Sequence, residues 1–394
     1  MVQSIESQIG ITLTRILENP IVLDVETSTS NKGNAFDLTN QLVTVQLKQG
    51  EKPPQVFFQE DFDKVIPILD KASCVIAFNS KFDLNWIQRH FGWKCKSVWC
   101  CQLAEFIFSA QQWKYPSLDG TCDKYGLDHK IDIVKTEYWE KGVDTPDIPR
   151  EILAEYGAYD VEPTWQVFKK QVDRFRTTNA FQFNLFRLHC NDLLVLQEME
   201  FNGLKYDCEN SLKQAGDLDT KVNNIESKLN EIFTTNIVNY SSNDHISSLL
   251  YGGTIKEEKR IPIGVYKTGA KTGQTRYKKL EILHNFDRIV EPLKNTELKK
   301  EGYYSTEEPV LLSLKTNKFS KKAITLLLER AKIVKLQSTY LRGLPNLNIK
   351  MNWEKDFLFP TYNQCVTITG RLSSVKPNGQ NIPEEAKKYC VSRF

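Results

Sequence analysis

Short apolar segments that lead into stretches of helical spacing constrain the fold of this 394-residue chain more than any other feature. Residues 21–25 and 74–78 are apolar runs of strand length, and residues 42–47 alternate as a partly exposed strand does. Residues 82–91 then place apolar side chains at helical spacing. Strands followed by helices predict a mixed α/β domain over about the first 185 residues.

The chain changes character after this region. Asp147 and Pro149 suggest the start of a helix, which Pro163 is expected to kink or break. An apolar helical stripe begins near residue 187, and helices are expected over residues 212–233 and 323–341. Residues 252–280 are rich in Gly, Lys and Thr, which predicts an exposed basic loop or hairpin.

Charge is distributed unevenly along the chain. Residues 1–200 carry 21 Lys and Arg against 28 Asp and Glu, whereas residues 201–394 carry 31 against 21. A carboxylate-rich half can hold divalent metal ions, and a basic half can hold a polyanion such as DNA. Surface solvation also produces such a split, so charge alone does not decide between these explanations.

Cysteine usage and hydropathy indicate a cytoplasmic protein without a membrane partner. The nine cysteines include no Cys-x-x-Cys pair, and only five histidines are present, which argues against a structural zinc site. We expect reduced thiols that lie mostly in the core. No apolar run approaches the roughly 18 residues of a membrane span, and the N-terminus lacks a signal-peptide pattern.

Carboxylates recur where strands and helices begin or end. Asp24 and Glu26 alternate at the end of a predicted strand, so both side chains leave one face, where they suit Mg²⁺ or Mn²⁺. Asp83 falls in the first turn of a helix, and Tyr156 and Asp160 are four residues apart on another. Each has a simpler explanation, such as a helix-terminal charge or a buried Tyr–Asp hydrogen bond. Together, however, they suit two-metal phosphodiester hydrolysis.

In this order and context, the five residues resemble the three motifs of the 3′–5′ exonuclease domain of family A DNA polymerases. Residues 115–118, 124–127 and 134–139 are similar to phage members of that family. The resemblance implies a ribonuclease-H-like fold, a mixed sheet with flanking helices. It also implies a proofreading role in DNA replication in a bacterial host cytoplasm if the chain is phage-encoded.

The resemblance implies a role for each residue of the motifs. Asp24 would contact both of two Mg²⁺ or Mn²⁺ ions. Glu26 and Asp160 would help to hold the ion that activates water, and Asp83 would support the other ion. Tyr156 would position the attacking water.

The basic half resembles the thumb and the beginning of the palm of the same family. Residues 198–203, 303–311 and 329–340 are similar to thumb segments, and residues 369–383 are similar to the segment along the primer–template minor groove. By this resemblance Arg371 would contact the primer end, and Gln380 and Asn381 the nearby duplex. Such side chains can bond minor-groove acceptors that every base pair offers.

Further DNA contacts are expected from Asn79, which lies four residues before Asp83, and from the basic segment of residues 252–280. In that segment we interpret four residues as phosphate contacts of the thumb: Lys271, Arg276, Lys278 and Lys279. The alternative for these four is a solvated basic loop.

The resemblance divides the chain into three segments. Residues 1–186 would form the exonuclease domain, residues 187–350 a mainly α, thumb-like DNA-binding region, and residues 351–394 an N-terminal fragment of an α+β palm. No His-Asp dipeptide of the kind found in the family's polymerase site occurs in the sequence. We therefore expect a separate polypeptide to supply the rest of the palm and the fingers.

Partner binding is expected to use the end of the chain, where apolar side chains at Val366, Ile368, Leu372 and Ile382 would otherwise face water. The leading hypothesis is therefore a proofreading, DNA-gripping subunit of a split polymerase, which binds a single-stranded 3′ end and primer–template duplex. A free-standing exonuclease and a non-enzymatic DNA-binding assembly module are alternatives. Exoribonuclease activity also stays open, because the same carboxylates can cleave RNA.

Overall fold

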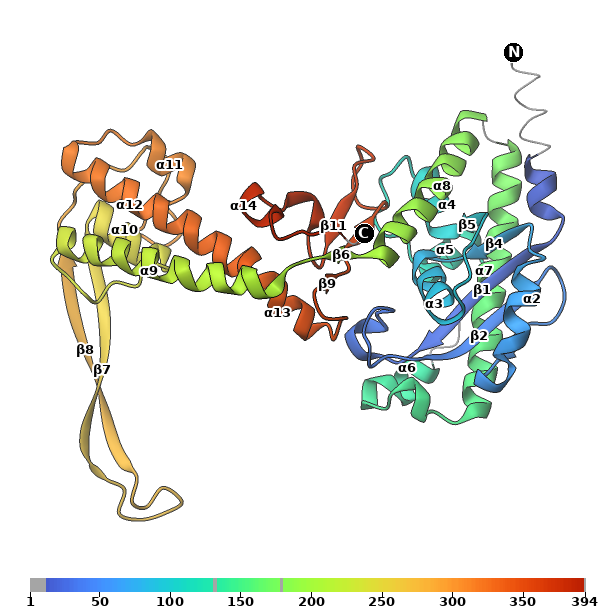
Figure 1. Cartoon of the computed structure of the whole chain (residues 1–394), viewed down its shortest axis with the longest axis horizontal. Helices are drawn as coiled ribbons and strands as arrows, with labels where there is room; N and C mark the ends of the chain where they lie inside the picture. The colour runs from blue at the N-terminus through green and yellow to red at the C-terminus, as the bar shows by residue number, and fades with distance from the viewer. Residues whose placement is uncertain (1–11, 130–132, 178–179, 393–394) are drawn as a thin grey trace. The chain divides into compact units, whose positions relative to one another are not determined.

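The computed structural model describes residues 12–129, 133–177 and 180–392, which fall into two compact units (Figure 1). The first unit combines residues up to Cys208 with those from Leu344 onward, and the second is Glu209–Gly343. The predicted boundaries at residues 186 and 350 concern family domains and stay a prediction. No helix within the described ranges is long and apolar enough to cross a membrane.

A five-stranded mixed sheet forms the centre of the first unit, in the order β3-β2-β1-β4-β5. Strand β1 pairs antiparallel with β2 and parallel with β4, while β5 is parallel to β4 and β3 is antiparallel to β2. The strands are β1 (Pro20–Thr27), β2 (Leu42–Gln49), β3 (Gln55–Phe57), β4 (Cys74–Ala77) and β5 (Val98–Cys100).

Helices flank this sheet, as the sequence predicted for a mixed α/β domain. The long α7 packs on β1 and β2, and α8 packs on α3, α4 and β5. The helices of this region are α2 (Val65–Leu69), α3 (Lys81–Phe91), α4 (Cys101–Phe108), α5 (Leu118–Tyr125), α6 (Ile133–Glu137), α7 (Arg150–Thr177) and α8 (Ala180–Asn202).

Two local expectations were wrong, and a third is decided only in part. Strand β2 is buried on both faces rather than partly exposed, because α7 covers the face that carries Thr44 and Gln46. The helix begins at Arg150, since residues 145–147 form a separate 3-10 turn. It also runs through Pro163 as one helix, so the proline does not break it, whereas the predicted kink stays a prediction.

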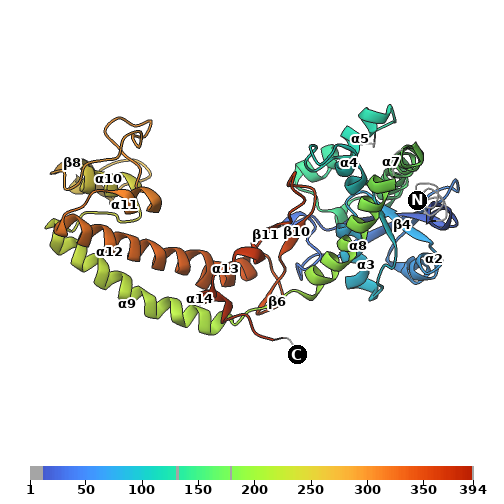
Figure 2. The same cartoon turned by 90° about the horizontal axis from the view of Figure 1, so that it is seen from above.

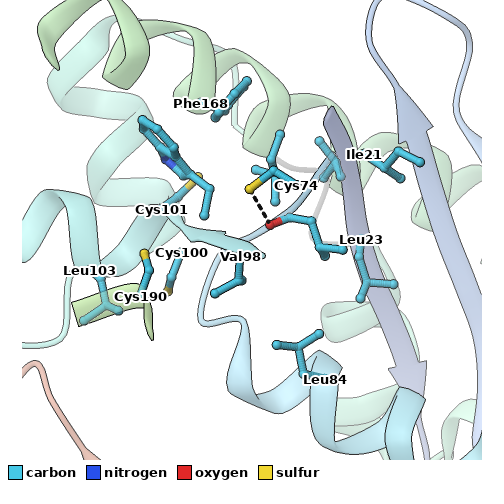
Figure 3. Packing of buried hydrophobic residues seen from close by; sticks show 14 of the residues in the cluster. Ile21, Leu23, Cys74, Leu84, Val98, Cys100, Cys101, Leu103, Phe168 and Cys190 are labelled. Carbon is cyan, nitrogen blue, oxygen red and sulfur yellow. Dashed lines mark hydrogen bonds between the residues drawn. The ribbon is translucent and has the colours of Figure 1, made fainter. Parts of the chain in front are cut away.

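The core of the first unit lies between the sheet and its helices (Figure 3). Ile21 and Leu23 of β1 lie there with Phe168 of α7 and with several thiols, among them Cys100 and Cys190. All nine cysteines are free and six are buried, which confirms the prediction of reduced, mostly core thiols. Burial raises the pKa of the Cys74 thiol to about 11, so this sulfur stays protonated and unreactive.

Residues 344–392, here called the C-terminal segment, belong to the same unit as the sheet. Strand β9 pairs with β6, which follows α8, and β10 pairs with β11. Ile382, predicted to face water, is buried, whereas Ile368 is 53% exposed and Val366 and Leu372 are half-buried. The elements are β6 (Leu204–Lys205), α13 (Gly343–Lys350), β9 (Phe357–Leu358), β10 (Thr361–Asn363), β11 (Ser373–Val375) and α14 (Glu384–Lys387).

The second unit consists of an antiparallel helix pair with a smaller helical cap and a long hairpin. Helices α9 and α12 run side by side (Figures 1 and 2), and Arg330 Nε donates to Glu226 Oε1 between them at 2.6 Å. The predicted basic loop or hairpin is a hairpin, which extends away from the helices. The elements are α9 (Cys208–Phe233), α10 (Asn243–Tyr251), β7 (Gly253–Val265), β8 (Thr275–Phe286), α11 (Glu308–Ser313) and α12 (Lys318–Lys335).

Candidate active site

Strand β1 carries the first two candidate carboxylates at one end of its ladder with β2. Asp24 lies opposite Gln46 and Glu26 opposite Thr44, and the register shifts directly after Glu26. Because side chains alternate along a strand, the two carboxylates share one face. Asp24 is half-buried and Glu26 is buried, and both lie toward the end of the central strand, which α7 contacts.

A glycine lets α7 approach the sheet beside these acids. A Cβ added at Gly157 would lie 2.5 Å from Nε2 and 2.7 Å from Cγ of Gln46. Gln46 has no room to yield, because its side chain is buried and its Nε2 donates to Thr44 Oγ1 at 2.6 Å. The close packing of the helix on β2 brings Asp160, three residues beyond this glycine, over Asp24 and Glu26.

Asp24, Glu26 and Asp160 form a carboxylate cluster whose oxygens lie within 4.8 Å of one another. Three acids at this spacing repel unless protons or cations neutralise them. Carboxylate oxygens are the donors that Mg²⁺ and Mn²⁺ prefer. This donor set therefore fits a divalent cation.

Asp83 approaches the cluster from α3. Its side chain is only 3% exposed, and burial, followed by the charge of Asp24, raises its pKa well above the usual value. Hydrogen bonds from the backbone N–H groups of Asp83 and Val25 act in the opposite direction. A carboxylate whose ionised form is disfavoured in this way is stabilised when a cation binds nearby.

Four of the five predicted catalytic residues line one pocket of about 340 Å³: Asp24, Glu26, Tyr156 and Asp160. The Tyr156 ring is buried in a small apolar cluster and meets the Trp139 ring edge to face at 6.1 Å. The adjoining loop turns at Gly33, which has a φ of +67°. A Cβ added there would lie 2.5 Å from Thr27 Oγ1, so the turn requires glycine for both reasons.

Sequence reasoning did not single out several residues of this pocket, notably Lys32, Phe82 and Trp139. Phe82 is adjacent to Asp83, and Trp139 ends a segment that resembles the exonuclease family, so both had a local signal. Lys32 had none, because only the turn of the loop after β1 brings this exposed side chain to the pocket.

Asn79 lies in a different pocket from the carboxylates. It has a positive φ of 64° and lines a pocket of about 160 Å³ together with Tyr115 and residues 363–365 of the C-terminal segment. That pocket also contains Lys81, at the first position of α3. The two pockets therefore flank the beginning of the helix that carries Asp83.

The remaining predicted DNA contacts are exposed. Arg371, Gln380 and Asn381 lie on the surface of the C-terminal segment. The far part of the hairpin, residues 259–280, contains seven Lys and Arg and no Asp or Glu. Lys271, Arg276, Lys278 and Lys279 all belong to it and are exposed, although Lys279 Nζ contacts Glu258 at 2.8 Å.

Comparison with known proteins gives two family matches along the chain. Residues 7–173 match a family model described as 3′–5′ exonuclease, and residues 281–393 match one described as DNA polymerase family A. The chain is 28% identical to DNA polymerase I of Bacillus subtilis over 73% of its own length and 27% of that protein. It is 24% identical to the DNA polymerase of Bacillus phage SP01 over 81% and 36% of the respective lengths.

A solved structure shares the fold. It is the POL domain of Pol1 from M. smegmatis in complex with DNA primer-template and dNTP, with a TM-score of 0.63 at 15% identity. The match covers 96% of this chain and 56% of that one. The chain also spans only about a quarter to a third of the curated polymerases that it matches over most of its length.

Proposed function

We propose, from the premise that the chain corresponds to an N-terminal part of a family A DNA polymerase with its 3′–5′ exonuclease domain, that it is a metal-dependent proofreading exonuclease. The observation that carries this proposal is the cluster of Asp24, Glu26 and Asp160, whose oxygens lie within 4.8 Å of one another. The sheet order around it supports a ribonuclease-H-like domain, and the helix pair and C-terminal segment support thumb and partial palm assignments.

The carboxylates would hold two Mg²⁺ or Mn²⁺ ions. Such ions supply a nucleophile at neutral pH and stabilise charge on the leaving oxygen. Asp24 belongs to the cluster with Glu26 and Asp160, and its charge also acts on Asp83, which suits a ligand shared by both ions. The Tyr156 hydroxyl, in the same pocket, would orient the attacking water toward the phosphodiester.

Exonuclease activity is tested with the purified chain and Mg²⁺ or Mn²⁺ on single-stranded DNA. We expect release of 5′-mononucleotides from the 3′ end and complete loss of this activity in Asp24→Ala. Asp63→Ala removes an exposed acid from another part of the same unit and serves as the matched control. Unchanged activity in Asp24→Ala would refute the assignment, and a preference for RNA would favour the exoribonuclease alternative.

The basic half would grip primer–template DNA. The acid-free hairpin end supports phosphate contacts by Lys271, Arg276, Lys278 and Lys279. The exposed side chains of Arg371, Gln380 and Asn381 support minor-groove contacts. Asn79, which is exposed and lines the second pocket, supports contact with the unpaired strand.

We further propose, as the partner for primer extension, a separate polypeptide that carries the polymerase palm and fingers. Among the described residues, β11 pairs with no strand other than β10, and Val375 of β11 and nearby Ile368 are exposed, which supports a protein-binding surface there. Mixing the chain with such a polypeptide should give co-elution in size exclusion and primer extension. Extension by this chain alone would refute this part of the proposal.

A further inference from the structure

A buried ion pair connects three parts of the first unit. Lys81 Nζ, at the start of α3, lies 2.5 Å from Glu200 Oε1 near the end of α8, with side chains only 12% and 4% exposed. Glu200 Oε1 also accepts the Tyr362 N–H of β10 at 2.7 Å, and Lys81 Nζ donates to the Tyr362 carbonyl. The pair therefore holds both backbone polar groups of one residue in the C-terminal segment.

The first turn of α3 lacks a side-chain cap at its N-terminus. Ser80, at the N-cap, makes no side-chain capping hydrogen bond, and Asn79 before it has a positive φ. Lys81 is the first residue of the helix, and Asp83 follows two residues later. Side-chain contacts of Lys81 therefore bear directly on the backbone turn that presents Asp83 to Asp24.

The loop after β1, the strand that carries Asp24 and Glu26, also contacts the C-terminal segment. The loop after β1 receives a hydrogen bond from Trp353 Nε1 to Asn34 Oδ1 at 3.3 Å, and its Leu38 N–H donates to the Asn352 carbonyl at 2.9 Å. The Phe36 and Phe359 rings stack with centroids 4.3 Å apart. Residues 352–362 thus contact the loop on one side of the carboxylates and α3 on the other.

We propose that Lys81 and Glu200 are positioning residues of the exonuclease site, which fasten β10 to the first turn of α3 and so hold Asp83 opposite Asp24. This inference rests on the proposed exonuclease function. Its consequence is that the polymerase-like C-terminal segment is a working part of the exonuclease, rather than an independent module beside it.

A purely stabilising role makes a different prediction from a positioning role. Replacing both members of a buried ion pair with apolar residues of similar volume is often neutral for stability, whereas removing one member leaves an uncompensated buried charge. Lys81→Met combined with Glu200→Met restores charge balance but cannot bond Tyr362. If positioning matters, this double variant folds like the parent and still cleaves slowly.

The test measures steady-state cleavage of a single-stranded DNA with Mn²⁺ for Lys81→Met, Glu200→Gln and the Met–Met double variant. Because misplacing a catalytic group by about 1 Å costs on the order of 10²-fold, we expect kcat to fall by roughly 10- to 100-fold, while KM stays close to that of the parent. Glu198→Gln is the matched control, since Glu198 pairs with Lys94 at 2.7 Å between the same two helical regions, with side chains 37% and 63% exposed.

A second readout does not depend on activity. Hydrogen exchange of the metal-free protein should show faster exchange of the first-turn amides of α3 in all three variants, and of the Tyr362 amide in the double variant, which removes its acceptor on residue 200. Neither change is expected in Glu198→Gln. The proposal is overturned if the double variant is folded and cleaves at the parental rate, or if these amides keep their protection. Absence of cleavage by the parent would instead refute the exonuclease function itself. The exchange measurement would still test whether Lys81 and Glu200 fasten β10 to α3.

Discussion

Replacing Gly157 with alanine should damage catalysis more than stability. The added methyl group would lie 2.5 Å from Gln46 Nε2 and 2.7 Å from its Cγ, so either the Gln46 side chain or α7 must move. Gln46 is fully buried and bonded to Thr44. The helix is therefore expected to move outward, and Tyr156 and Asp160 move with it.

The magnitude follows from two opposing effects. Overpacking a core costs about 1–3 kcal/mol, whereas alanine in place of glycine within a helix gains about 1 kcal/mol. The net loss of unfolding free energy is then about 0–2 kcal/mol. A shift of about 1 Å at Asp160, by contrast, would lower the cleavage rate on the order of 10²-fold.

The assay compares denaturant unfolding with exonuclease rate for Gly157→Ala and two companions. Gly216→Ala is the matched control, because this glycine lies within α9 and an added methyl group meets nothing within 4 Å. It should stabilise its helix by about 0.5–1 kcal/mol and leave cleavage unchanged. Gly157→Ala combined with Gln46→Ala removes the clash and should recover much of the rate. A parental rate in Gly157→Ala itself would refute the reasoning.

Three further outcomes follow from the same geometry. Tyr156→Phe should still bind metal ions, as measured by calorimetry. Its cleavage rate should fall on the order of 10²-fold, as expected when one preorganised polar contact is lost. Burial and the charge of Asp24 raise the pKa of Asp83 above its unfolded value of 3.8, so its contribution to stability is fully present below that value and is lost as pH rises through the folded pKa. In chelator, Asp83→Asn should therefore flatten the fall of Tm from acidic to neutral pH, and an unchanged slope would contradict this. The last change replaces four basic hairpin residues with Ala: Lys271, Arg276, Lys278 and Lys279. The slope of log binding constant for duplex DNA against log salt concentration should fall by at most about 0.9 per lost phosphate contact. An unchanged slope would favour a solvated loop.

Local patterns placed the carboxylates of the candidate site on their elements, but only their combination and the family resemblance singled them out. Asp24 and Glu26 follow the period of a strand, and Tyr156 and Asp160 follow the period of a helix, so each pair could be placed on one face from its spacing alone. The apolar runs likewise gave the strands that carry or precede these residues. Such signals depend only on neighbours in the sequence.

Contacts between distant segments were not predictable in the same way. The alternation of β2 suggested an exposed face, but α7, more than a hundred residues later, covers it. The link from Lys81 to Tyr362 spans 281 residues, and no local pattern marks either partner. Burial of Ile382 was missed for the same reason, since it depends on how the C-terminal segment folds back.

The geometry of the carboxylates must be maintained by residues outside the carboxylate cluster. Asp24, Glu26, Asp83 and Asp160 come from β1, α3 and α7, and without cations their charges push these three elements apart. Close packing at Gly157 holds α7 against β2, and the Lys81–Glu200 pair holds α3. Cations that bind the folded chain in preference to the unfolded chain would turn this repulsion into attraction and raise stability with their concentration. Contacts outside the cluster would therefore preorganise the site, and bound cations would complete its stability.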